Sequence, residues 1–400
     1  MPYCQIPPQC GLLSAPAAAV RLMSAKKNKI LPTLLRLSLC GILMAWIFQA
    51  IFWSEGKRAW EEQNRQPEWH QLSREQRLHV SWEYGPRELW RNLSKVRGGP
   101  FAISILVMGG TILLSVIRWR QVLEVHGLQL SFGRAMEISI VAHFFNSFLL
   151  GATGGDLIKA YYAARETHHK KVEAVGTVFV DRIVGLFSLL LFAVVAMALN
   201  VPLLNSDPVF QKLSIFVIAM AAGGAVATFL AFRGGTSKML PRVREWIRKL
   251  PKGDSIERLR DSFLVIGRHK RVLFSTILLS LLINFVAIVH VQTVAWGLGS
   301  NVAFWQLLTI VPIISCFIVL PISPSGLGVR ENLFVYMLIA PQIADSASMA
   351  LALSLLCFAG SLFWSLVGGV VYASFMSSHH LDDIAADEGG EDEAISAKLD

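Results

Sequence analysis

The sequence is dominated by eight apolar runs, each close to the length that a helix needs to cross a lipid bilayer. A transmembrane helix takes about 20 mostly apolar residues, because the hydrocarbon core is roughly 30 Å thick. Only 16% of the residues are charged, whereas a soluble protein usually carries about 25%. These features predict an all-α polytopic membrane protein. The runs cover residues 32–53, 101–117, 135–152, 175–199, 212–232, 272–298, 304–320 and 347–376.

The sequence lacks the residue spacings of the common nucleotide-binding, metal-binding and catalytic motifs. No segment has the pattern of a nucleotide-binding glycine loop, a metal site or a catalytic triad. The five cysteines lie far apart, at Cys4, Cys10, Cys40, Cys316 and Cys357, and the last three fall in apolar runs. We therefore expect buried core cysteines rather than a disulfide framework. We expect no metal, no cofactor and no nucleic acid as a partner.

The first apolar run shows no sign of being a cleaved signal peptide. It ends in "IFWSEGK", without the small residues of a cleavage site, and is expected to remain as a transmembrane helix. The segment before it is rich in proline and alanine, and Met23 opens a second, more basic start, "MSAKKNK". Both Met1 and Met23 stay open as the initiator.

Basic residues indicate which connections face the cytoplasm, because Lys and Arg are enriched on that side of the membrane. The N-terminal segment is basic, and residues 233–271 hold twelve Lys or Arg against four acidic residues. The connections 200–211 and 299–303 have no basic residue and are expected outside. We predict a bacterial inner-membrane protein with both termini in the cytoplasm.

The same charge pattern predicts that two apolar segments enter the membrane without crossing it. Residues 118–134 and 159–171 are both basic, so the chain between them would enter and return, as a re-entrant hairpin at 135–166. A second interrupted segment, at 304–340, contains "PISPSGLGVRE", whose prolines and glycines break a helix. Eight ordinary spans are the alternative.

The fold predicted from this topology has six full transmembrane helices and two re-entrant broken-helix hairpins. The two halves run in opposite directions, which is the inverted repeat of many secondary transporters. In the external loop, "SREQ" has the pattern of a helix capping box. The predicted segments are a cytoplasmic N-terminus (1–31), a first transmembrane helix (32–53), an external Trp-rich interfacial loop (54–100), a first membrane repeat (101–232), a basic cytoplasmic loop (233–271), a second membrane repeat (272–376) and an acidic disordered tail (377–400).

Charged residues inside apolar runs cost about 2.5–3.5 kcal/mol each on insertion scales and are usually paired or functional. The first group lies in "GATGGDLIKAYYAAR". Gly154 and Gly155 permit a sharp turn, and the following helix would direct N–H groups at an anion. Asp156 and Lys159 share a helix face. The alternative is a cytoplasmic loop in which these two side chains simply pair.

The second group is the adjacent pair in "VFVDRIVGL". Neighbouring residues point about 100° apart on a helix, so Asp181 and Arg182 each need a partner elsewhere. This favours a packed polar cluster. The alternative places both near the inner interface, with Arg182 extended toward head groups.

The third group lies in the break of the second hairpin, "PISPSGLGVRE". Irregular backbone at membrane depth persists only where protein buries it or water reaches it. An arginine there is suited to bond a phosphate through two parallel hydrogen bonds, and the alternative is a structural break with an Arg–Glu pair. The turn residues are Pro321, Pro324, Gly326 and Gly328, and the binding candidates are Ser323, Ser325, Arg330 and Glu331.

Three further polar residues are weaker candidates for the same cavity. Asn146 lies near the tip of the first hairpin, and Asn284 and His290 lie in one span. A lone buried polar residue more often bonds one helix to another.

The three motifs, in this order, resemble the lysylphosphatidylglycerol synthase transmembrane family, a flippase-like domain that also occurs as free-standing bacterial inner-membrane proteins. The resemblance covers roughly 101–376. One departure is Lys159, where the family commonly has arginine, and lysine lacks the planar fork for two parallel bonds to phosphate. The chain shows no aminoacyltransferase domain after the membrane part, so the resemblance implies lipid handling rather than aminoacyl transfer.

The functional hypothesis is a cavity formed by both hairpins around Asp156, Lys159, Asp181, Arg182, Arg330 and Glu331. Its bases would neutralise the phosphate of an anionic lipid or polyprenyl-phosphate-linked lipid, which would then move between leaflets. The alternatives are a membrane-embedded transferase and an accessory or scaffold subunit. Enzymes of lipid or glycan synthesis are the expected partners, and the oligomeric state is open.

Overall fold

The computed structural model describes six continuous stretches of the chain and part of a helical segment before them. The stretches are 68–148, 154–167, 170–233, 262–320, 323–344 and 346–378, and the earlier positions are Gln49, Phe52, Trp53, Gly56, Lys57, Trp60 and Glu61. The predictions for the N-terminus, for most of the first transmembrane helix and for most of the basic loop and acidic tail lie outside these residues.

Five helices are long and apolar enough to cross a membrane, which confirms the polytopic all-helical class. They correspond to five of the six predicted full spans; the remaining one, 32–53, lies almost entirely outside the described residues. The long helices are α3 (Gly98–Val125), α6 (Lys171–Leu199), α8 (Pro208–Arg233), α12 (Lys270–Gly297) and α15 (Ala347–Ser378).

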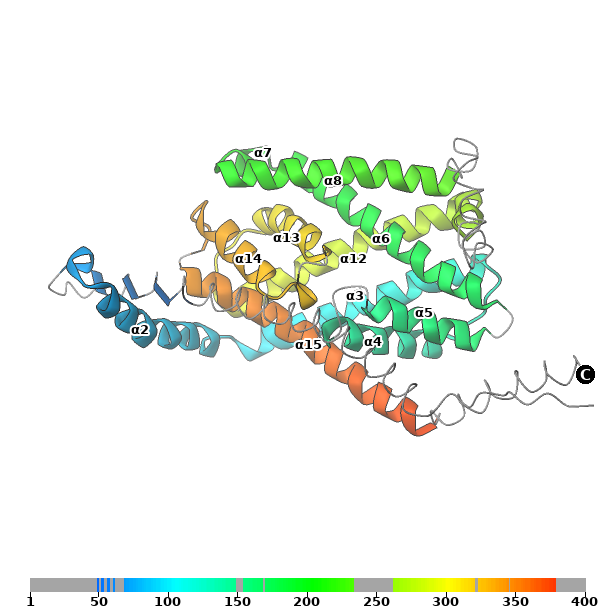
Figure 1. The fold of residues 1–400 in the computed structure, drawn as a ribbon, viewed down its shortest axis with the longest axis horizontal. Helices are drawn as coiled ribbons and strands as arrows, with labels where there is room; N and C mark the ends of the chain where they lie inside the picture. The colour runs from blue at the N-terminus through cyan, green and yellow to red at the C-terminus, as the bar shows by residue number, and fades with distance from the viewer. Residues whose placement is uncertain are drawn as a thin grey trace, which may run out of the picture.

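Four shorter helices lie where the two hairpins were predicted. They contain 11 to 17 residues, so at about 1.5 Å per residue they are shorter than the roughly 30 Å core of a bilayer. Figure 1 shows α4 and α5 toward one end of the long helices and α13 and α14 toward the other end. These helices are α4 (Phe132–Phe148), α5 (Gly154–Glu166), α13 (Phe304–Ile318) and α14 (Val329–Ile339).

The chain enters and leaves each pair of short helices at the same end of the long helices. In Figure 1, α3 ends and α6 begins on the right, with α4 and α5 between them, whereas α12 ends and α15 begins on the left. The ends of α3, α8 and α15 and the starts of α6 and α12 therefore lie on one side of the molecule. Three basic stretches of the sequence, 118–134, 159–171 and 233–271, adjoin these helix ends.

The two halves of the membrane part pack in matching ways. Helices α3 to α6 form one set of four, and α12 to α15 form the other. Helix α4 packs on α15 as α13 packs on α6, and α3 packs on α15 as α12 packs on α6. Helix α3 also packs along α12, its counterpart in the other set. This exchange of partners is the pattern that a two-fold related repeat produces.

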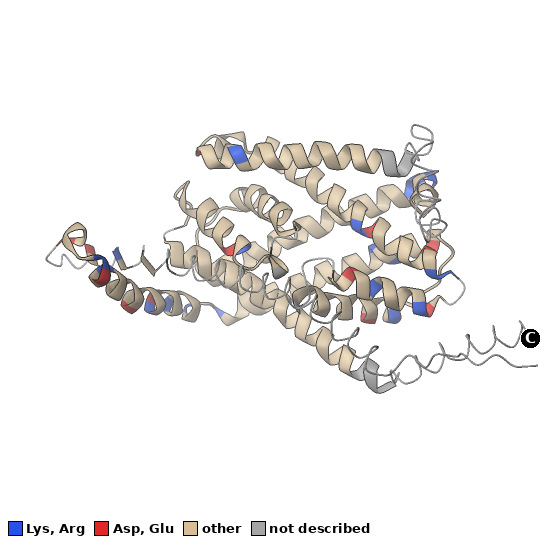
Figure 2. Ribbon diagram, viewed as in Figure 1, with Lys and Arg blue, Asp and Glu red and all other residues tan. Residues whose placement is uncertain are grey.

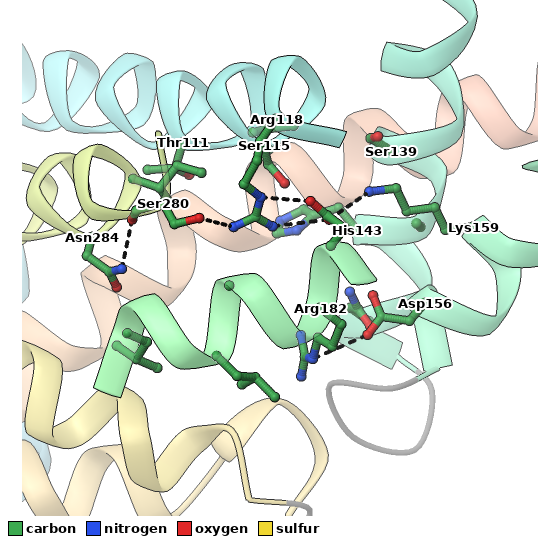
Figure 3. A pocket seen from close by; sticks show the side chains of 18 of the residues that line it. Thr111, Ser115, Arg118, Ser139, His143, Asp156, Lys159, Arg182, Ser280 and Asn284 are labelled. Atoms are coloured by element: carbon green, nitrogen blue, oxygen red, sulfur yellow. Dashed lines mark hydrogen bonds and ion pairs between the residues drawn. The ribbon is translucent and has the colours of Figure 1, made fainter. Parts of the chain in front are cut away.

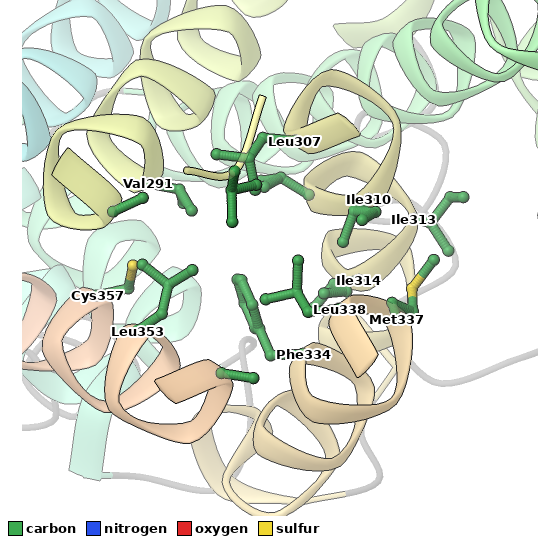
Figure 4. Close-up of a cluster of buried hydrophobic side chains, with 14 of the residues drawn as sticks. Val291, Leu307, Ile310, Ile313, Ile314, Phe334, Met337, Leu338, Leu353 and Cys357 are labelled. Atoms are coloured by element: carbon green, nitrogen blue, oxygen red, sulfur yellow. The ribbon is translucent and has the colours of Figure 1, made fainter. Parts of the chain in front are cut away.

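An apolar core fills the space around the second pair of short helices (Figure 4). Leu307, Ile310 and Ile313 of α13 have no exposed surface. Met337 and Leu338 of α14 are equally buried. Close-packed hydrocarbon side chains therefore fill the space between α13 and α14.

Smaller elements lie outside the two sets of four helices. Helix α2 (Arg74–Ser94) follows η1 (Trp69–Gln71) and packs on α15, and α7 (Val201–Leu204) precedes α8. The predicted capping box is confirmed, because Ser73 Oγ accepts from the Gln76 N–H at 3.2 Å and Gln76 Oε1 accepts from the Ser73 N–H at 2.9 Å.

Two further sequence predictions can be compared with the structure. Cys316 and Cys357 are buried and free, as expected of core cysteines. The boundary at 117 was wrong, because α3 continues to Val125. Arg118 and Arg120, counted as part of a basic connection, therefore lie inside the helix.

Candidate functional site: a charged cavity between helices

A cavity of about 330 Å³ lies between α3, α4, α5, α6 and α12 (Figure 3). Figure 2 shows charged residues on these helices, and others on α2, near the start of α8 and at the start of α14. Residue Val319, directly after α13, also reaches the cavity wall. The charged residues that line it are Arg118, Asp156, Lys159, Asp181 and Arg182.

Three of these side chains form a buried cluster around one carboxylate. Arg118 donates from Nε to Asp181 Oδ1 at 2.7 Å and from a terminal nitrogen to Asp181 Oδ2 at 3.1 Å. Its other terminal nitrogen donates to Ser280 Oγ at 2.9 Å. Lys159 Nζ lies 3.5 Å from Asp181 Oδ2. The three charged side chains are at most 10% exposed, so this triad is held inside the protein.

The remaining two charges form a looser and more accessible pair. Arg182 Nε lies 3.5 Å from Asp156 Oδ2, and the two side chains are 30% and 28% exposed. Figure 3 shows this pair facing each other across the cavity from the triad. Asp181 and Arg182 take different partners, as their adjacent positions on a helix required.

The alternative in which Asp156 and Lys159 simply pair with each other is not what the structure shows. Asp156 meets Arg182 and Lys159 meets Asp181, so both residues of α5 take partners from α6. The Lys159 ammonium also lies 4.2 Å from the centre of the Trp119 ring, a cation–π distance. Asp156 and Lys159 therefore both pair with opposite charges on the facing helix α6.

The start of α5 is fixed by close approach to α4. Both Gly154 and Gly155 lie inside α5, whereas the sequence suggested that they form the turn itself. A Cβ on Gly155 would lie 2.0 Å from the Ala142 carbonyl oxygen, so only glycine fits. The Gly155 N–H donates to Asn146 Oδ1 at 2.8 Å, and Asn146 thereby caps α5 from the end of α4.

The break in the second half touches the break in the first half. Ser325, in η2 (Pro324–Gly326), has left-handed backbone angles of φ 51° and ψ 21°. Its hydroxyl lies 3.1 Å from the Asn146 carbonyl oxygen and 3.0 Å from that of Ser147, at the end of α4. Gly326 and Gly328 also have positive φ, at 71° and 81°. The described turn residues thus form an irregular link between the two pairs of short helices, while Pro321 lies outside the described residues.

Arg330 and Glu331 were expected in the shared cavity, but they are not among the residues that line it. Glu331 is fully buried, accepts from the Gly328 N–H at 2.6 Å and pairs with Arg330. Arg330 also donates to Ser354 Oγ at 3.3 Å and lies 4.5 Å from the Phe358 ring. The two charges pair with each other, and Arg330 also contacts α15.

The other candidates divide between the cavity and the helix packing. Asn146 and Asn284 line the cavity, and Asn284 donates to the Ser280 carbonyl at 2.8 Å. His290 instead bonds Ser104 and Cys357 carbonyl oxygens, so it joins helices. Ser323 is buried away from the lining.

Sequence reasoning missed several residues of the cavity. Arg118 was the most consequential omission, because the predicted span ended one residue before it. The useful signal was that "SVIRWRQVLEV" keeps helix-forming residues through the charges. Ser139 and His143 of α4 and Ser280 of α12 carry no comparable signal, since isolated polar residues are common in transmembrane helices.

Comparison with known proteins agrees with this architecture. Residues 78–377 match the sequence model of the lysylphosphatidylglycerol synthase transmembrane region. The chain belongs to this family. It is also 22% identical over 288 residues to the UPF0104 membrane protein PH1989 of Pyrococcus horikoshii, an alignment that covers 67% of this chain and 85% of the relative.

The cavity of this lysylphosphatidylglycerol synthase transmembrane-family member has an excess of positive charge. Three cationic side chains face two carboxylates, so the ionised set sums to +1. Ser139 Oγ adds a buried hydroxyl that has no hydrogen-bond partner among the described residues. Within those same residues, no group of three His, Cys, Asp or Glu side chains could hold a metal. The donors present are suited to an anion with several oxygen acceptors.

Proposed function

We propose that this protein binds the phosphate of an anionic lipid in the charged cavity and moves the lipid between the leaflets of the bacterial inner membrane. The observation that carries the proposal is the cavity itself, with one positive charge in excess between apolar helices. An ionised group at membrane depth is costly unless paired. A lipid phosphate would supply the missing negative charge.

The size of the cavity fits a head group and excludes the whole lipid. One water takes about 30 Å³ in the liquid, so a cavity of about 330 Å³ has room for roughly ten waters or one phosphate-bearing head group. The acyl or prenyl chains would remain in the bilayer beside the apolar helix surfaces. The unpartnered Ser139 hydroxyl supports a polar occupant, because buried polar groups usually have a hydrogen-bond partner.

We further propose that the two pairs of short helices are re-entrant hairpins that enter the membrane from opposite faces. Their lengths, their places at opposite ends of the long helices and the matched packing of the two halves support this arrangement. The end that joins the basic connections would face the cytoplasm. Inverted halves with broken helices suit alternating access, in which one half moves against the other.

Transport is tested with purified protein in liposomes that contain fluorescent phosphatidylglycerol. A membrane-impermeant reductant bleaches the outer leaflet, so movement between leaflets appears as additional bleaching. We expect wild-type protein to increase this movement and Arg182→Gln to reduce it, because that change removes a cavity cation. Arg87→Gln is the matched control, since Arg87 is 73% exposed on α2.

Two results would contradict the proposal. Folded wild-type protein that moves the lipid no faster than empty liposomes would exclude translocation of phosphatidylglycerol. A covalently altered lipid, found by mass spectrometry of the extract, would indicate a transferase in place of a transporter.

A further inference from the structure

We propose that the cavity selects lipids whose head group carries a single negative charge, and that Arg182 holds the phosphate in exchange for Asp156. The inference rests on the proposed function, because it assumes that a lipid phosphate enters the cavity. It goes further by assigning the charge class of the substrate and the side chain that binds it.

The charge class follows from the balance of the cavity. Arg118, Lys159 and Arg182 contribute three positive charges, and Asp156 and Asp181 contribute two negative charges, which leaves +1. A net charge between apolar helices is unfavourable, so the occupied cavity is most stable when the sum is zero. A phosphodiester lipid with one negative charge meets this condition. A zwitterionic lipid leaves +1, and a dianionic phosphate leaves −1.

The residue that would bind the phosphate is the cation that can leave its present carboxylate partner at least cost. All of the Arg118 nitrogens already donate to Asp181 or Ser280, and its side chain is 10% exposed. Lys159 is 8% exposed, bonded to Asp181 and stacked on Trp119. Moving either cation would leave the Asp181 carboxylate buried with fewer donors.

Arg182 differs from the other two cations in both exposure and bonding. It is 30% exposed, and Asp156 is its one ion-pair partner within the described residues, at 3.5 Å. That distance is longer than the 2.7–2.9 Å of a strong charge-assisted bond. The planar guanidinium can bond two phosphate oxygens in parallel, which a single 3.5 Å contact to Asp156 does not match.

Variants that alter the charge of the cavity are expected to change which lipid head group the protein prefers. Asp156→Asn raises the sum to +2, so a dianionic head group becomes the best match. Arg182→Gln lowers the sum to zero and removes the planar donor, so the preference for an anion is lost. Arg87→Gln removes an exposed arginine of α2 and leaves the cavity balance unchanged.

The test measures lipid binding apart from transport. Full-length protein in detergent is titrated with phosphatidylglycerol, with phosphatidylcholine, and with phosphatidic acid at a pH above the second ionisation of its phosphate. The apparent Kd comes from the dependence of Tm on lipid concentration. We expect wild-type protein and Arg87→Gln to bind phosphatidylglycerol roughly tenfold or more tightly than the other two lipids. Asp156→Asn is expected to prefer phosphatidic acid, and Arg182→Gln to prefer phosphatidylcholine, because its head group leaves the charge sum of that variant at zero.

The outcomes separate this inference from the proposed function. Equal binding of the three lipids by wild type, or an unchanged preference in Arg182→Gln, overturns the inference even if transport occurs. Selective binding that follows the charge balance, without movement between leaflets in liposomes, supports the inference and contradicts transport.

Discussion

Asp181 holds two of the three cations that line the cavity, and no other carboxylate among the described residues pairs with either of them. The Arg118–Asp181 pair has two parallel hydrogen bonds, a geometry that fixes both side chains. Lys159 is then held by a contact with Oδ2 of the same carboxylate and by the Trp119 ring. The fixed triad leaves the Arg182–Asp156 pair as the adjustable part of the site.

Removal of the central carboxylate charge tests this division of roles. We predict that Asp181→Asn lowers the free energy of unfolding by about 3–5 kcal/mol, because two buried cations lose their counter-charge. Unfolding in detergent measures the change. Glu124→Gln is the control, since Glu124 is 60% exposed and its pair with Arg120 is worth little. Similar stabilities of the two variants would contradict the role of Asp181.

A second residue-scale prediction concerns the fit between α4 and α5. Gly155→Ala should reduce stability by about 1–3 kcal/mol, because the added methyl group overlaps the Ala142 carbonyl. Gly133→Ala, in α4 itself, has open space around the new Cβ and should be neutral or slightly stabilising. Thermal unfolding of the two variants provides the comparison, and equal losses would argue against close approach as the reason for Gly155.

At the residue scale, the sequence was informative about charge and uninformative about partners. Asp156, Lys159, Asp181 and Arg182 could be selected because ionised groups are rare in apolar runs. Their pairing could not be predicted, because it depends on how α6 is rotated against α5. Arg118 was missed for a different reason, since its helix extends eight residues past the predicted end, to Val125.

Among the elements, the contact between the two breaks is the feature that joins the halves of the molecule. Ser325 bonds carbonyl oxygens at the C-terminal end of α4, which have no partner within their own helix. The end of α4 also supplies Asn146, whose side chain caps α5. The same junction therefore provides hydrogen-bond partners for the end of α4 and for the start of α5.

Two substitutions at Ser325 separate its hydroxyl from its backbone geometry. Ser325→Ala loses the hydroxyl and keeps a side chain at φ 51°, whereas Ser325→Gly loses the hydroxyl and relieves the left-handed strain. We predict that both are less stable than wild type and that the alanine variant is the less stable of the two, by about 1 kcal/mol. Thermal unfolding gives the order. A reversed order would mean that the left-handed backbone is not a cost at this position.

On the scale of the whole molecule, the matched packing of α3–α6 and α12–α15 gives one protein two non-equivalent halves. The helices of the first half, together with α12, surround a charged cavity, whereas α13 and α14 of the second half pack in an apolar core and the Arg330 and Glu331 side chains pair with each other. The sequence predicted the five long helices and the irregular turn before α14, because apolar length and glycine are local signals. It placed the charges of both breaks in one cavity, and that was wrong because burial depends on packing between distant helices.

The hairpin arrangement predicts which connections share a side of the membrane. Cysteines at Gln129 and Lys170, in a background without the native cysteines, should react with an impermeant thiol reagent from one face. Cysteines at Asn301 and Gln342 should react from the opposite face. All four positions are exposed. Labelling of Gln129 and Lys170 from different faces would show that the segment between them crosses the membrane once, and would contradict the re-entrant arrangement.

The most direct test of the central claim is a cryo-electron microscopy structure of the protein in phosphatidylglycerol nanodiscs. We predict density for a lipid phosphate in the cavity, within hydrogen-bond distance of Arg182, with Asp156 displaced from the guanidinium and the Arg118–Asp181 pair intact. The claim would be contradicted by lipid density around the protein but none in the cavity, with Arg182 still paired to Asp156 and head groups only at the membrane surfaces.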